Sequence, residues 1–66
     1  MYQIFITNML TAEVEIFTYK NKQMALNRFK GFCLELGYKY THVKTFNVFT
    51  AGGIGYPSRI ELVEQQ

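Results

Sequence analysis

Apolar and polar residues alternate along the first part of the chain, which is typical of β-strands. The alternation covers Tyr2–Thr7 and Ala12–Tyr19, and Asn8–Thr11 between them has the composition of a turn, so we expect a β-hairpin. Matching the apolar faces of the two strands predicts these core residues: Ile4, Ile6, Val14 and Ile16. Phe5 and Phe17 are then expected on the outer face of the sheet.

The hydrophobic period changes after Tyr19 to that of an amphipathic helix. Its apolar positions fall within an arc of about 120°; they are Ala25, Leu26, Phe29, Phe32, Cys33 and Leu36. Asn21 is suited to cap the amides of the first turn, and Gly37 is suited to the left-handed residue that follows a helix. We therefore predict a helix from about Asn21 to Leu36.

Strand character returns over His42–Thr50, but its apolar residues divide between two faces. Phe46 and Val48 share one face, while Val43 and Phe49 share the other, so a single register cannot bury both pairs. A bulge near Lys44 and Thr45 would bring Val43 inward beside Phe46 and Val48.

Glycine and proline then predict a loop over Thr50–Pro57, and Ser58–Glu64 alternates once more as a strand. The predicted order is ββαββ within one domain, residues 1–66. This is an α+β fold in which one amphipathic helix packs on a four-stranded, mainly antiparallel sheet. The second face of the sheet is left for solvent or for a second copy of the chain.

The residue types present make catalysis and metal binding improbable. The chain has one cysteine, one histidine and no aspartate, so an internal disulfide or a zinc site built from Cys and His is excluded. Cys33 lies on the apolar stripe of the helix, where a thiol is inert. Glu13 and Glu15 would need a cleft above them to act as paired carboxylates. We expect no enzymatic activity, no metal and no cofactor.

The apolar runs are far shorter than the roughly 18 residues of a membrane span, and the start of the chain lacks the pattern of a signal peptide. An unpaired cysteine fits a reducing compartment. We expect a cytoplasmic protein with no membrane partner.

Six of the seven cations lie in the middle of the chain: Lys20, Lys22, Arg28, Lys30, Lys39 and Lys44. Aromatic and basic residues interleave here, as on surfaces that bind single-stranded nucleic acid through stacked bases and phosphate contacts. The residues predicted for such a surface are Tyr38, Lys39, Tyr40, Lys44, Phe5 and Phe17. In the simpler interpretation, these side chains only decorate a half-exposed strand.

The predicted outer face of the helix carries residues that are unusual for a solvated surface: Met24, Gly31 and Leu34, with Arg28 beside them. The glycine-rich loop presents Ile54 and Tyr56 at its tip. These six residues favour a small non-catalytic protein-interaction module, an inhibitor, adaptor or regulator that docks on a larger protein. Small accessory proteins encoded by mobile elements often have this profile. Scattered surface apolar residues are also common.

The remaining hypothesis is a homodimer in which two outer sheet faces stack through Phe5, Phe17 and Phe49. It competes with single-stranded nucleic-acid binding for the same aromatic rings.

Overall fold

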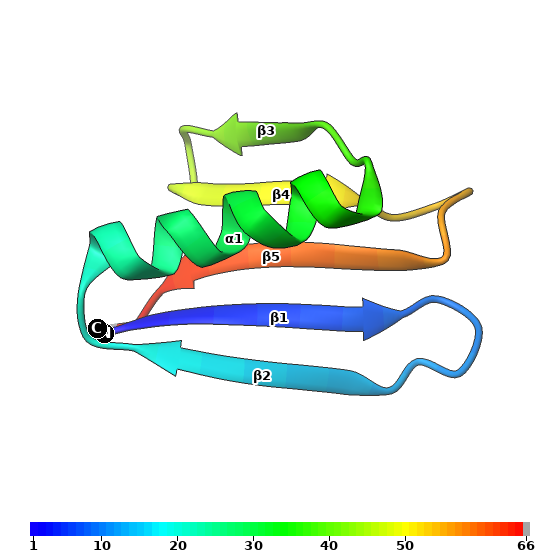
Figure 1. The fold of residues 1–66 in the computed structure, drawn as a ribbon, viewed down its shortest axis with the longest axis horizontal. Helices are drawn as coiled ribbons and strands as arrows, with labels where there is room; N and C mark the ends of the chain where they lie inside the picture. Colours follow the sequence, from blue (N-terminus) through cyan, green and yellow to red (C-terminus); the bar gives the residue numbers. More distant parts are fainter. Residues whose placement is uncertain (66) are drawn as a thin grey trace.

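A computed structural model describes residues 1–65 and shows one helix packed on a five-stranded antiparallel sheet (Figure 1). The elements are β1 (Tyr2–Asn8), β2 (Val14–Tyr19), α1 (Lys22–Leu36), β3 (Tyr40–Val43), β4 (Val48–Gly52) and β5 (Ser58–Glu64). The α+β class is confirmed. The prediction of four strands in the order ββαββ was wrong, because the order is ββαβββ.

The strands lie in the order β2-β1-β5-β4-β3, so the last strand is the central one. β5 pairs along its whole length with β1 and joins the β1–β2 hairpin to the β3–β4 hairpin. The two ends of the chain consequently meet at one side of the sheet (Figure 1), where the Gln65 amide donates to the Met1 carbonyl at 2.7 Å.

The region predicted as one strand, His42–Thr50, contains a turn. β3 ends at Val43 and β4 begins at Val48, so the positions expected to bulge lie in the connecting turn. Asn47 takes a positive φ of 52° there, a conformation that Asn tolerates. The turn explains why the apolar residues of this segment cannot share one register. Phe46, predicted to be buried, lies in the turn and is 76% exposed.

The pairing of β2 with β1 reverses the predicted faces of β2. Ile4 pairs with Phe17 and Phe5 pairs with Ile16, so Phe17 lies on the helix side with buried Ile4. The predicted core residues Val14 and Ile16 lie on the outer face, 48% and 55% exposed. Alternation along a strand shows which residues share a face, but it does not show which of the two faces is buried. Here the aromatic set faces the helix, where Phe17 meets Phe32 with ring centroids 5.5 Å apart.

The same correction applies to β3 and β4. Phe49 pairs with buried Leu62 and therefore faces the helix, which leaves Val48 and Val43 on the outer face. The predicted inward placement of these two valines was wrong, and so was the outward placement of Phe49.

The helix follows the sequence closely. The Asn21 side chain accepts hydrogen bonds from the amides of Gln23 and Met24, and Gly37 has a left-handed φ of 73°. The buried core consists of Ala25, Phe29 and Cys33 from α1 with Ile4, Ala51, Ile60 and Leu62 from the sheet. Leu36, at the last position of the predicted stripe, is 49% exposed. Within residues 1–65, no helix has the length and apolarity needed to cross a bilayer.

Candidate interaction surfaces

The sheet face that α1 leaves uncovered is unusually poor in charge. Paired residues share a face and alternate along each strand, which places these side chains outward: Gln3, Phe5, Thr7, Val14, Ile16, Thr18, Thr41, Val43, Val48, Thr50, Arg59, Glu61 and Val63. We call this set the outer sheet face. Sheets with one wet face normally carry polar side chains there, whereas this face consists mostly of β-branched and aromatic residues.

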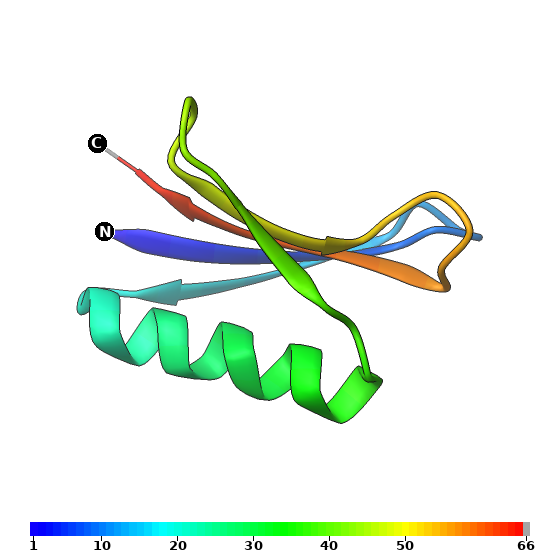
Figure 2. The ribbon, with the colours of Figure 1, turned by 90° about the horizontal axis from the view of Figure 1, so that it is seen from above.

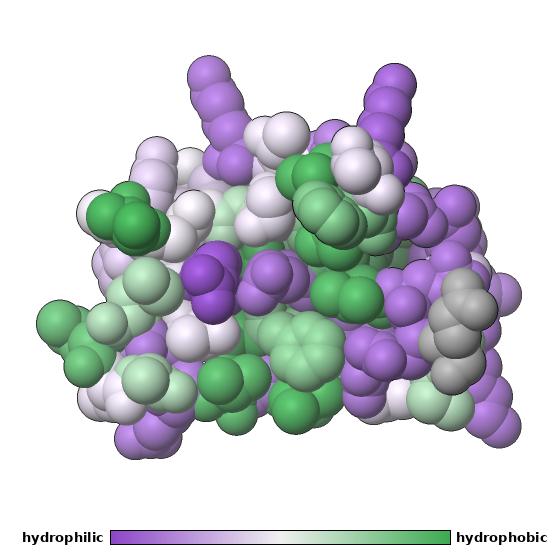
Figure 3. All heavy atoms as spheres, turned by 180° about the vertical axis from the view of Figure 1, so that it is seen from behind, coloured by the Kyte–Doolittle hydropathy of each residue, from purple (hydrophilic) through white to green (hydrophobic). Residues whose placement is uncertain are grey.

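The apolar residues of the outer sheet face form two groups, which meet polar positions where β5 pairs with β1, because Val63 is paired with Gln3 and Phe5 with Glu61. Val43, Val48 and Val63 form a row across β3, β4 and β5, because each is paired with the next. Phe5 on β1 is paired with Ile16 on β2, so apolar side chains also lie on the outer face of these two strands. Figure 3 views this side and shows apolar patches separated by polar side chains near the middle, with a broad polar area toward the right of the view.

The charges on the outer sheet face neutralise each other. Among the described residues of this face, Arg59 and Glu61 alone are charged, and Arg59 Nε lies 3.4 Å from Glu61 Oε1. Both side chains are partly exposed, 45% and 34%, so the pair adds little to stability.

A second surface lies on the helix side, between α1 and the β3–β4 hairpin. α1 packs mainly on β5, β1 and β2, and β3 diverges from it toward the β3–β4 turn (Figure 2). The floor of the resulting groove is formed by Tyr2, Leu26, Phe49 and Leu62, and its rims carry Lys22, Asn47 and Glu64. The enclosed space is about 10 Å³, so the groove is a shallow surface and not a ligand cavity.

Aromatic rings extend this groove along β3 and β4. His42 lies flat on Phe49, with ring centroids 4.2 Å apart and planes within 5°. Tyr40 contacts the edge of Phe29 at 5.7 Å and approaches Phe49 at 6.1 Å. We call Tyr40, His42 and Phe49 the aromatic shelf; Tyr40 and His42 are exposed at its surface.

His42 is held in place by a polar chain that crosses the end of the sheet. One ring nitrogen of His42 lies 3.0 Å from Asn47 Oδ1, and Asn47 Nδ2 donates to Glu64 at 3.4 Å. Burial first, and then the nearby Glu64 carboxylate, raise the pKa of Tyr2 on the groove floor. These contacts give the exposed shelf a defined shape.

The residues predicted to bind a protein partner do not form one patch. Met24, Gly31 and Leu34 are exposed on α1, while Ile54 and Tyr56 lie in the β4–β5 loop. The Arg28 guanidinium lies 4.8 Å above the Phe32 ring, so its contact is within the molecule. Tyr56 packs edge-on against Tyr38 at 5.1 Å, whereas Ile54 is 97% exposed.

The residues predicted to bind nucleic acid are also distributed over different surfaces. Phe5 lies on the outer sheet face, and Phe17 lies on the helix side beneath Phe32. The Tyr38 hydroxyl is within 3.0 Å of the Ser58 hydroxyl, near the opposite end of β3 from the turn. Tyr40 belongs to the aromatic shelf, and the lysines predicted with these rings, Lys39 and Lys44, lie just before and just after β3.

The His, Cys and acidic side chains of the described residues are dispersed over the fold. No group of three His, Cys or acidic side chains within residues 1–65 is placed to hold a metal ion. Cys33 is buried, 2% exposed, whereas His42 is exposed and bonded to Asn47. Glu13 and Glu15 line an open hollow of about 300 Å³ beside the start of β5.

Burial raises the pKa of the Cys33 thiol above its ordinary value of 9.0. The unfolded chain therefore loses this proton at a lower pH than the folded chain, so the contribution to stability is complete below pH 9 and falls as the pH rises. We expect the free energy of unfolding to decline less steeply above pH 9 in Cys33→Ala than in the parent chain. Urea denaturation at several pH values measures both slopes, and equal slopes would contradict the assignment.

Comparison with known protein families, curated proteins and solved structures gives no match. The two surfaces described above are therefore the basis on which function is inferred.

Proposed function

We propose that this chain is a small, non-catalytic protein-interaction module that binds through its outer sheet face. The observation that supports this most strongly is the composition of that face. Apolar side chains lie on all five strands, and the described charged side chains there pair with each other. Exposed apolar patches bordered by polar residues are typical of surfaces that contact another protein.

A second copy of the chain is the partner that fits this face. The molecule measures 30 × 24 × 21 Å, so a contact over its broad face buries at most roughly 700 Å² per protomer, near the ~800 Å² of a standard interface. Domains of this size bury only about 60% of their unfolded surface. Stacking two sheets gives each chain a second apolar layer.

The polar centre of the face suits a symmetric contact. In a two-fold dimer the same patch meets itself. Arg59 and Glu61 point outward from the same strand, one pleat apart. A two-fold axis crossing β5 between them places each side chain opposite the other's counterpart, which satisfies both charges across the interface.

This arrangement leaves the outer face of α1 free. Met24, Gly31 and Leu34 lie on the side of the molecule away from the outer sheet face, and an added Cβ at Gly31 would meet no atom within 4 Å. Docking on a larger protein as an inhibitor, adaptor or regulator would use this second surface of the proposed dimer.

Ile16→Glu tests the interface, because it places a charge on the outer sheet face, where Ile16 is 55% exposed, without disturbing the buried core. Leu34→Glu is the matched control, since Leu34 is 85% exposed on the helix. In sedimentation equilibrium we expect the parent chain and Leu34→Glu to approach twice the 7.7 kDa of one chain. Ile16→Glu should weaken association at least tenfold and remain near 7.7 kDa at the same concentration.

The proposal fails if the parent chain stays monomeric at all concentrations, or if Leu34→Glu dissociates the dimer and Ile16→Glu does not. Circular dichroism of each variant verifies that the fold is retained.

A further inference from the structure

We infer that the groove between α1 and the β3–β4 hairpin binds single-stranded nucleic acid, with bases stacked on the aromatic shelf and phosphates held by surrounding lysines. This site does not depend on the proposed dimer, because it lies on the opposite side of the sheet from the outer sheet face. Experiments can therefore refute the nucleic-acid site without refuting the dimer, and the dimer without refuting the nucleic-acid site.

The aromatic shelf provides the stacking surface. His42 is exposed and parallel to Phe49, so a base placed on the free side of the imidazole continues an existing stack. Tyr40 is 42% exposed beside it and is braced from below by Phe29. Rings fixed in this way bind bases without an entropy cost for ordering the protein, and they accept any base because every base has a π-face.

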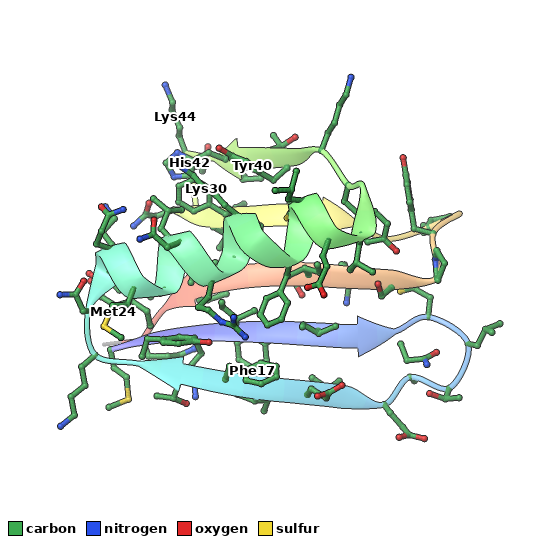
Figure 4. The ribbon with its side chains drawn as sticks, viewed as in Figure 1. Phe17, Met24, Lys30, Tyr40, His42 and Lys44 are labelled. Atoms are coloured by element: carbon green, nitrogen blue, oxygen red, sulfur yellow. The ribbon has the colours of Figure 1, made fainter. Side chains whose placement is uncertain are left out.

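Lysines from α1 lie on the groove side of the helix, and two more lie at the ends of β3. Lys22 lies on the groove rim, and Lys30 projects from α1 on the side of Tyr40 and His42 (Figure 4). Lys44, in the β3–β4 turn, projects outward beyond the edge strand β3 (Figure 4), where it can contact the nucleic-acid strand as it leaves the shelf, and Lys39 precedes β3 at its other end. Among the contacts of residues 1–65, none of these four lysines is in an ion pair, so their charges are free for phosphates.

The acidic group on the rim is already engaged. Glu64 accepts from Asn47 at 3.4 Å, lies beside Tyr2 and lines the groove together with Lys22, and Lys22 and Lys30 together outnumber this one carboxylate. The site therefore combines a net positive rim with flat, exposed rings. Paired bases in a duplex are not available for stacking on such rings, so the complementary ligand is a single strand.

Fluorescence anisotropy with a labelled oligothymidylate of about 12 nucleotides, and with the matching oligouridylate, tests the inference. If three or four phosphates are neutralised, the dissociation constant should rise roughly 20- to 50-fold between 50 and 200 mM salt. Equal affinity for both oligomers indicates recognition without the 2′-hydroxyl, and tighter binding of one identifies the preferred nucleic acid.

Tyr40→Leu should weaken binding roughly tenfold by removing a stacking ring. His42→Ala, at an exposed position, should weaken it at least about threefold and tests the same surface if Tyr40→Leu does not fold. Lys30→Gln should reduce the salt dependence, whereas Lys20→Gln should not. Lys20 follows β2, the strand at the opposite edge from β3.

Several results would overturn the inference. The first is that a duplex or polyphosphate competes as well as the single strand. The second is that Tyr40→Leu and His42→Ala both bind with unchanged affinity. The third is that Lys20→Gln and Lys30→Gln change the salt dependence of binding equally. Any of them would show that the shelf and its lysines do not form a binding site for exposed bases.

Discussion

Phe29→Ala is expected to unfold the domain or nearly so. Phe29 is completely buried, and its ring packs near Tyr40 and Phe49 at 5.7 and 6.0 Å. Removing a buried phenyl ring costs about 3–5 kcal/mol, because the apolar contacts are lost and a cavity remains. A core this small supplies only about 3–5 kcal/mol. Urea denaturation followed by circular dichroism measures the loss.

Phe46→Ala is the matched control for this substitution. The same ring is removed, but from a side chain that is 76% exposed in the β3–β4 turn. Its effect on the free energy of unfolding should stay within about 0.5 kcal/mol. Similar losses in both variants would mean that the core is not centred on Phe29.

Gly52→Ala should also destabilise the domain strongly. Gly52 ends β4 with a φ of +74°, a conformation that side chains rarely adopt. An added Cβ would overlap the Ser58 carbonyl oxygen and press on the Tyr38 ring, 3.0 Å away. Backbone strain and overpacking together should cost about 2–4 kcal/mol. Thermal and urea denaturation provide the measurement.

Gly31→Ala should have the opposite sign. Gly31 lies inside α1 with open space where its Cβ would be, so alanine should stabilise the chain by about 0.5–1 kcal/mol. If Gly52→Ala is tolerated as well as Gly31→Ala, the close approach of the β4 end to Ser58 is not present in solution.

The helix could be predicted because its local signals agree. The cap at Asn21, the spacing of the apolar residues and the glycine at position 37 all act within a few residues of one another. The strands could not be placed as well, because their buried face depends on partners distant in sequence. Phe17 illustrates this: alternation groups it with Glu15 and Tyr19, but pairing with Ile4 is what places it inside.

The turn after β3 was missed for a related reason. Lys44–Asn47 contains neither glycine nor proline, so composition did not reveal it. The conflict between the two apolar faces of that segment was the available signal, and a turn resolves it as well as a bulge does. The apolar character of the outer sheet face was underestimated, because Val14, Ile16, Val43 and Val48 were predicted to face the core.

The aromatic shelf was only partly predictable. The interleaved segment pointed to Tyr40 and Lys44, whereas Lys22 and Lys30 lie on a different element and were not included. Lys22 and Lys30 each lie four residues from Leu26, which places these three residues on one side of the helix. His42 was not predicted to belong to this surface, because its contact with Phe49 depends on the β3–β4 pairing.

The most direct test of the outer sheet face as an interface is an isotope-filtered nuclear Overhauser experiment on a mixture of labelled and unlabelled chains. It detects contacts between protomers without altering any residue. The account predicts contacts between protomers from the methyl groups of Ile16, Val48 and Val63. Contacts arising instead from Met24 or Leu34, or none at all, would contradict it.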